Sequence, residues 1–321
     1  MHWSKDLKSL RRGVRLATRA TLAQLRQNVV APAAIRPAVP QGFALLPAFS
    51  PNPGRLRALT WLPSRPIRTG APLIVLLHGC GQEAASFATD SGWTALADRL
   101  ALPLLLPEQR DANHGQRCFQ WFRPEEIARG CGEAGSIAAM VSRAIAHFGS
   151  DRGRVFIAGL SAGGAMAASV LAAHPELFSA GAVVAGLPVG TAGNAMAALG
   201  RMATGGPDRH PDAWAASVRS TRPKDHAGTW PRLSVWHGAS DDIVVPANGE
   251  QLAKEWAALH RLPEAPPDAG GVHRRWGEAV EFWRLPGLAH GWPVAAGGNA
   301  GKFTFDNPVP AVPMIARFWG L

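Results

Sequence analysis

The feature that most constrains the fold of this 321-residue chain is a serine turn, Gly159-Leu160-Ser161-Ala162-Gly163. The apolar run Val155 to Ala158 comes directly before it, and an Ala-rich stretch, Ala165 to Ala173, follows. A strand that turns this tightly into a helix needs glycine on both sides of the serine, because a Cβ there would collide with neighbouring backbone. The turn lifts the serine hydroxyl out of the sheet, beside a helix N-terminus that favours developing negative charge. We therefore predict Ser161 as a nucleophile, although an ordinary Gly-rich strand-to-helix turn would carry the same residues.

Composition indicates a globular chain with a sizeable core. Hydrophobic residues make up 47% of the sequence, the mean hydropathy is −0.01, and no apolar run approaches the ~18 residues of a membrane span. The formal net charge is +10, and most of it lies in residues 1–36, where eight Lys or Arg accompany one Asp. Basic and aromatic residues are not interleaved along the rest of the chain, which argues against nucleic acid as a partner.

The sequence divides into three parts. Residues 1–36 have apolar residues at helical spacing opposite Arg and Lys, which predicts a basic amphipathic extension. Residues 1–34 could bind a granule or membrane surface, or could form a solvated extension. Residues 37–54 are a Pro-rich lead-in, and residues 55–321 are expected to form the catalytic domain. Arginines interrupt any apolar signal region, so a cytoplasmic protein is expected, with secretion as the alternative.

The order of elements after residue 54 predicts an α/β fold. Short apolar strands alternate with helical patterns, as in a mostly parallel, doubly wound sheet. Residues 190–230 have weak periodicity and many Gly, Pro and Ala, which predicts a small cap segment over a site. Strands are expected at residues 55–62 (an edge strand), 72–77, 102–106, 155–158, 181–185, 233–236 and 280–285, and helices at 84–101, 133–148, 162–173, 246–260 and 312–319.

A serine hydroxyl becomes a good nucleophile only when a histidine takes its proton and a carboxylate orients that histidine. In a fold of this kind the acid and the histidine follow the serine in the chain, each after a strand. Asp241 comes after the strand 233–236 and is the expected acid, with Asp242 as the alternative. His290 follows the last predicted strand and is the expected base.

The charge that develops on the substrate oxygen needs backbone N–H donors around it. The loop after the strand 72–77 contains Gly79 and Gly81 on either side of Cys80, and we expect the Cys80 amide to be one donor. The amide of Ala162, directly after the nucleophile, is expected to be the other. This chemistry requires no metal and no cofactor.

Taken together, these segments resemble the poly(3-hydroxybutyrate) depolymerase family of esterases, which have the α/β-hydrolase fold and include feruloyl and acetylxylan esterases. The resemblance runs from about residue 55 to about residue 295. It is carried by Leu76-Leu77-His78-Gly79-Cys80-Gly81-Gln82, Leu106-Pro107-Glu108-Gln109, Arg117-Cys118-Phe119-Gln120-Trp121-Phe122, Gly159-Leu160-Ser161-Ala162-Gly163-Gly164-Ala165-Met166-Ala167, Gly186-Leu187-Pro188, His237-Gly238 with Asp241 and Val244, and Gly287-Leu288-Ala289-His290.

The resemblance implies a serine esterase with Ser161, Asp241 and His290 as its triad and a short hydroxyalkanoate ester as its substrate, polymeric or small. Feruloyl or acetylxylan esters are the alternative substrates. It also implies that Cys80 and Cys118 approach each other and could form a disulfide, which would leave Cys131 free. A protein of another class, which binds a granule or membrane surface through its basic N-terminus, is the remaining alternative.

Three aromatic residues are candidates for the walls of an acyl pocket. Trp121 and Phe122 follow the second cysteine, and Trp292 follows the expected base by two residues. The same side chains could instead belong to the core.

Overall fold

The central strands form because three apolar runs are long enough to be buried on both faces. Every residue of β3 (Leu73–Leu77), β5 (Val155–Leu160) and β6 (Ala180–Val184) is buried. A strand without a polar face is stable only in the middle of a sheet that helices cover on both sides. The computed structural model describes residues 39–221, 226, 228–297 and 301–321. The predictions for residues 1–36 fall outside this part of the chain.

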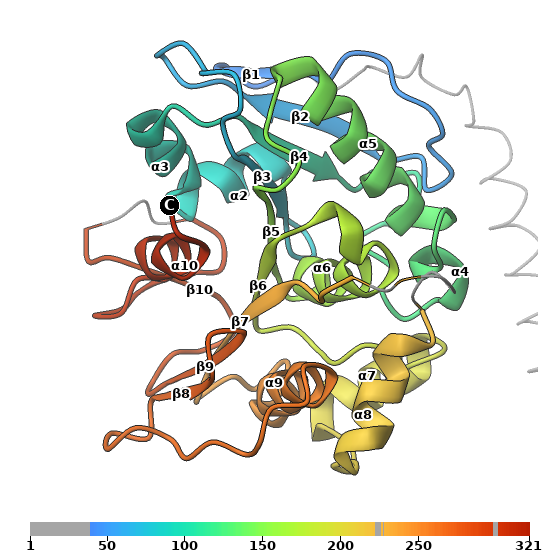
Figure 1. Cartoon of the computed structure of the whole chain (residues 1–321), viewed down its shortest axis with the longest axis vertical. Coiled ribbons are helices and arrows are strands. Elements are labelled where there is room, and N and C mark those ends of the chain that lie inside the picture. The colour runs from blue at the N-terminus through green and yellow to red at the C-terminus, as the bar shows by residue number, and fades with distance from the viewer. Residues whose placement is uncertain (1–38, 222–225, 227, 298–300) are drawn as a thin grey trace, which may run out of the picture. The chain divides into compact units, whose positions relative to one another are not determined.

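The described residues form a nine-stranded sheet in the order β1-β2-β4-β3-β5-β6-β7-β9-β8 (Figure 1). The pairs from β4 through β3, β5, β6 and β7 to β9 are parallel, and the outer pairs are antiparallel. A separate parallel pair joins β10 to β11. The remaining strands are β1 (Phe43–Leu45), β2 (Arg57–Trp61), β4 (Leu104–Glu108), β7 (Arg232–Gly238), β8 (His273–Trp276), β9 (Val280–Leu285), β10 (Trp292–Val294) and β11 (Thr304–Asp306).

Helices cover both faces of the sheet (Figure 1). They are needed on both faces because successive apolar side chains of β3 point to opposite faces. Leu73, Val75 and Leu77 join one core with α5, α6 and α9, whereas Ile74 and Leu76 join a second core with α2, α3 and α10. The α/β-hydrolase fold is thereby confirmed. The helices are α2 (Ala84–Asp90), α3 (Trp93–Leu100), α4 (Pro124–Ile127), α5 (Gly132–Phe148), α6 (Ala162–Ala173), the 3-10 turn η1 (Pro175–Leu177), α7 (Ala195–Thr204), α8 (Pro211–Arg219), α9 (Ala247–Leu259) and α10 (Ala311–Trp319).

Two expectations about elements are wrong. The strand expected at the edge, β2, lies inside the sheet, because β1 pairs with its outer side. The helix expected over residues 84–101 is two helices, α2 and α3. Gly92 takes a left-handed conformation with φ of +89°, which interrupts the helical backbone between them. Within residues 190–230 the structure places α7 and α8. No helix among the described residues is long and apolar enough to cross a membrane.

Candidate active site

Ser161 lies at the tight turn between β5 and α6. Its φ of 56° and ψ of −120° form a conformation that costs free energy for a residue with a side chain. Two glycines make this turn possible. A Cβ on Gly159 would lie 2.3 Å from the Gly163 carbonyl oxygen, and one on Gly163 would lie 2.3 Å from the Leu77 carbonyl oxygen. The steric reason predicted for these glycines is therefore visible in the backbone.

The structure brings the three residues expected to form a triad into one chain of hydrogen bonds. Nε2 of His290 lies 2.9 Å from Oγ of Ser161, and Nδ1 of the same ring lies 2.8 Å from Oδ2 of Asp241. All three side chains are buried or nearly so. The alternative acid, Asp242, is exposed. With Nδ1–H donating to the carboxylate, Nε2 is free to accept the serine proton.

Asp241 is held as a carboxylate acceptor from several sides. Its Oδ1 accepts backbone hydrogen bonds from Ile243 (3.0 Å) and Val244 (2.9 Å). Burial would raise the pKa of Asp241, but hydrogen bonds from His237 and His290 outweigh burial and hold that pKa below its ordinary value. Asp241 therefore stays ionised throughout the neutral pH range.

The two expected oxyanion donors lie beside the serine. Cys80 follows β3, Ala162 begins α6, and both line the same cavity as Ser161. Within the described part of the chain neither backbone N–H has a hydrogen-bond acceptor. Two unpaired amides next to a nucleophilic hydroxyl suit an oxygen that gains negative charge during reaction.

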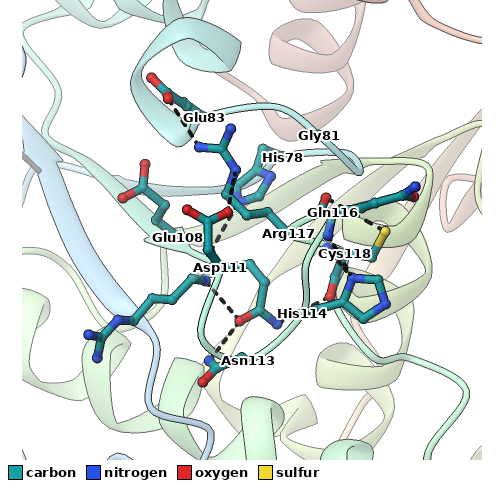
Figure 2. A network of polar contacts seen from close by, with 12 residues as sticks. His78, Gly81, Glu83, Glu108, Asp111, Asn113, His114, Gln116, Arg117 and Cys118 are labelled. Atoms are coloured by element: carbon teal, nitrogen blue, oxygen red, sulfur yellow. Dashed lines mark hydrogen bonds and ion pairs between the residues drawn. The ribbon is translucent and has the colours of Figure 1, made fainter. Parts of the chain in front are cut away.

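A disulfide ties the Cys80 loop to the loop between β4 and α4. The sulfur atoms of Cys80 and Cys118 are 2.13 Å apart, and Cys131 is a free, exposed cysteine. Figure 2 shows the polar contacts that accompany this link. The Gly81 amide donates to the Gln116 carbonyl oxygen (2.6 Å), and Arg117 pairs with Glu83 (3.0 Å). The two loops are therefore held together by covalent, backbone and ionic contacts.

A buried carboxyl group holds the loop between β4 and α4, and no pattern in the sequence indicated it. Glu133 of α5 accepts hydrogen bonds from the Gln109 side chain and from the backbone and side chain of Gln120. Burial raises the pKa of Glu133 to about 7. The two glutamines flank the segment that carries Cys118, so Glu133 fixes both ends of this segment.

The candidate site opens into a cavity of about 370 Å³ with mostly apolar walls. Trp121 and Phe122 line it, as expected of acyl-pocket walls. Trp292 does not. Its side chain is fully buried and packs edge-to-face against Phe87 and Trp93, so the interpretation of Trp292 as a pocket wall is corrected to a core residue.

Several further apolar side chains line the cavity without having been predicted as its walls, and four of them are large side chains from three separate segments. Leu199 and Met202 come from α7, Ile243 follows the acid, and Phe303 lies between β10 and β11. The weak periodicity of residues 190–230 gave no signal for the first two. Phe303 lies thirteen residues beyond His290, and no pattern in the sequence connects it to the site.

Comparison with known proteins agrees with this geometry. A family model described as Esterase PHB depolymerase matches residues 57–282. The chain is 35% identical over 288 residues to poly(3-hydroxyalkanoate) depolymerase C of Paucimonas lemoignei, with 85% of this chain and 69% of the relative covered. It is 30% identical over 211 residues to feruloyl esterase B of Neurospora crassa, with 64% of this chain and 70% of the relative covered.

The fold has a solved counterpart in an acetyl xylan esterase from Aspergillus awamori. The TM-score is 0.74 at 20% sequence identity, and the match covers 87% of this chain and 98% of the other. Fold and relatives together define a carboxylic ester hydrolase of the α/β-hydrolase class. More narrowly, the chain belongs to the Esterase PHB depolymerase family.

Proposed function

We propose that this esterase hydrolyses short hydroxyalkanoate esters through an acyl-enzyme formed on Ser161. The observation that carries the proposal is the unbroken hydrogen-bonded chain from Ser161 through His290 to Asp241. Ser161 Oγ attacks the ester carbonyl carbon while its proton passes to Nε2 of His290. The amides of Cys80 and Ala162 stabilise the oxyanion, and Asp241 stabilises the imidazolium.

The reaction then closes in two steps. The tetrahedral intermediate collapses, the ester C–O bond breaks, and the leaving alcohol takes the proton from His290. A water molecule attacks the acyl carbon and gives a proton to the same nitrogen. The acyl C–O bond to Ser161 then breaks, His290 returns the proton to Ser161 Oγ, and the carboxylic acid leaves.

The walls of the cavity support an apolar acyl group of modest length. The apolar side chains of Trp121, Phe122 and Leu199 face a space of about 370 Å³ that also holds the serine. A cavity of this kind favours aliphatic carbon through burial of apolar surface. The relative with 35% identity is by name a poly(3-hydroxyalkanoate) depolymerase, which supports a hydroxyalkanoate ester as the substrate class.

Feruloyl and acetylxylan esters are the second candidate substrates. The relatives from Neurospora crassa and Aspergillus oryzae, at 30% and 26% identity, are by name a feruloyl and an acetylxylan esterase. A flat ferulate ring could stack on Trp121, whereas an acetyl group would leave most of the cavity unfilled.

The test compares wild type with Ser161→Ala on p-nitrophenyl butyrate, hydroxybutyrate oligomers, methyl ferulate and acetylated xylan. We expect the substitution to lower kcat by about 10⁴- to 10⁶-fold, the usual cost of losing a triad member. Ser169→Ala is the matched control, because Ser169 is buried in the helix that follows Ser161 and its hydroxyl donates, among the described residues, only to the Ala165 carbonyl oxygen. An active Ser161→Ala enzyme would refute the mechanism, and the preferred ester decides between the substrate classes.

A further inference from the structure

A second histidine lies against the candidate triad acid. His237, near the end of β7, is fully buried, and its Nε2 lies 3.2 Å from Oδ2 of Asp241. The same nitrogen lies 2.7 Å from the carbonyl oxygen of Val244. His237 is not among the residues that line the cavity, so it does not face a bound substrate.

The surroundings of the ring decide which nitrogen carries the proton. A carboxylate and a carbonyl oxygen can only accept hydrogen bonds, so Nε2 of His237 carries the hydrogen. That hydrogen is donated to the Val244 carbonyl oxygen, and Oδ2 of Asp241 is a second, longer contact of the same nitrogen. The other nitrogen, Nδ1, is buried and has no hydrogen-bond partner among the described residues. A hydrogen on Nδ1 would have no acceptor there, so the hydrogen-bond partners place the donor of the ring on Nε2.

Helix α9 packs against the His237 ring, and a glycine at one position of the helix leaves room for the ring. A Cβ on Gly249 of α9 would lie 2.5 Å from Nδ1 of His237 and 2.9 Å from its Cγ. Such a separation is shorter than any real contact, so the ring and this glycine are matched in shape. The backbone of α9 therefore packs directly against the imidazole and leaves no room for a side chain at position 249.

We propose that His237 is a positioning residue that fixes the carboxylate of Asp241 for its hydrogen bond to His290. The inference rests on the proposed function, because it assumes that Asp241 orients the catalytic base. Oδ2 receives both imidazoles, while Oδ1 receives the amides of Ile243 and Val244. With three hydrogen bonds and the contact from His237 on its two oxygens, the carboxylate cannot rotate without losing hydrogen bonds.

An N–H donor beside Asp241 also suits the chemistry. During the reaction His290 becomes positively charged, and Asp241 must remain a carboxylate to stabilise it. The contact with His237 is one of the interactions that hold the pKa of Asp241 below its ordinary value, so it favours the carboxylate form as well as its orientation.

The test is a pair of substitutions at His237 measured on a soluble ester such as p-nitrophenyl butyrate. His237→Met keeps the length of the side chain and removes the donor, whereas His237→Gln retains an N–H near the position of Nε2. We expect His237→Met to lower kcat by about 10- to 100-fold with KM within about twofold, as for loss of a hydrogen bond to a charged group. We expect His237→Gln to recover kcat to within about threefold of wild type.

A second buried histidine provides the matched control. His174 is buried at the end of α6 that is opposite Ser161, bonds to Arg129 and does not line the cavity, so His174→Met should leave kcat unchanged. If His237→Met does not fold, Gly249→Ala is measured instead, because the added Cβ would displace the ring while leaving the donor in the chain. That variant should likewise lower kcat and leave KM unchanged.

A double substitution separates positioning from general support of the fold. In an Asp241→Asn background the residue to be positioned has lost its charge, so adding His237→Met should lower kcat by less than about twofold further. The inference is overturned if His237→Met lowers kcat equally in both backgrounds, or if His237→Met alone leaves kcat unchanged. In either case an inactive Ser161→Ala enzyme leaves the proposed function intact. An active Ser161→Ala enzyme instead overturns the proposed function itself.

Discussion

Asp241 and Asp242 are neighbours in the chain, but only Asp241 lies within hydrogen-bonding distance of His290. Asp241→Asn is expected to lower kcat by about 10⁴-fold, because an amide can hold His290 in the wrong tautomer. The side chain of Asp242 is exposed, so Asp242→Asn should stay within about twofold of wild type. Steady-state kinetics on one soluble ester compare the two variants. Equal losses in both would contradict the assignment of the acid.

Order along the chain predicts the residues of the candidate triad because each one follows a strand of a parallel sheet. Ser161 follows β5, Asp241 follows β7, and His290 follows β9, so all three meet at the carboxyl edge of the sheet. Trp292 lies two residues beyond His290, but its burial is decided by helices α2 and α3, some two hundred residues earlier in the chain. Contacts between residues so far apart in the chain leave no pattern in the sequence around Trp292.

Among the structural elements, the loop from β4 to α4 depends on its disulfide. The bond closes a segment of 38 residues between Cys80 and Cys118. On the chain-entropy account, the double variant Cys80→Ser with Cys118→Ser should lose roughly 4 kcal/mol of unfolding free energy. Urea unfolding measures this loss. Cys131→Ser is the control, because Cys131 is free and exposed and should be neutral; a loss as large as that of the double variant would contradict the prediction.

Helix α7 presents an apolar side chain to the cavity while remaining partly in solvent. Leu199 lines the cavity at 61% exposure, and Met196 lies one turn away at 78% exposure without lining it. Leu199→Ser should lower kcat/KM by about three- to tenfold for p-nitrophenyl hexanoate and leave the acetate ester nearly unchanged, because only the longer chain buries surface against Leu199. Met196→Ser should change neither. Equal effects on both esters would contradict a role in acyl binding.

The central strands of the parallel sheet could be predicted from the sequence, whereas the edge strand β1 and the cavity helix α7 could not. β3, β5 and β6 are continuous apolar runs, which require burial on both faces. β1 has three residues and pairs only because β2 offers an unpaired side. α7 is a short amphipathic helix, but it lies within a segment rich in Gly, Pro and Ala whose weak overall periodicity did not indicate it.

The stability of the whole molecule should depend on a histidine that joins two strands. His78 follows β3, and its Nε2 accepts a hydrogen bond from the Gln109 amide after β4 (3.1 Å). Burial lowers the pKa of His78 from its ordinary 6.5 to about 4. Between these values the unfolded chain binds a proton that the folded chain does not. The free energy of unfolding therefore falls as the pH falls from 6.5 to about 4, by roughly 2 kcal/mol at pH 5 for this ring alone.

Urea unfolding of wild type and His78→Gln at pH 7.5 and pH 5 measures this dependence. Glutamine can accept the same hydrogen bond through Oε1 and does not titrate, so the variant should lose less stability than wild type on acidification. His174, whose pKa burial also lowers to about 4, contributes with the same sign in both proteins and cancels in the comparison. His210→Gln is the control, because that side chain is exposed and its variant should follow wild type. If wild type and His78→Gln lose equal stability between the two pH values, His78 is not held neutral by the fold, and the link between β3 and β4 does not set the acid limit of the molecule.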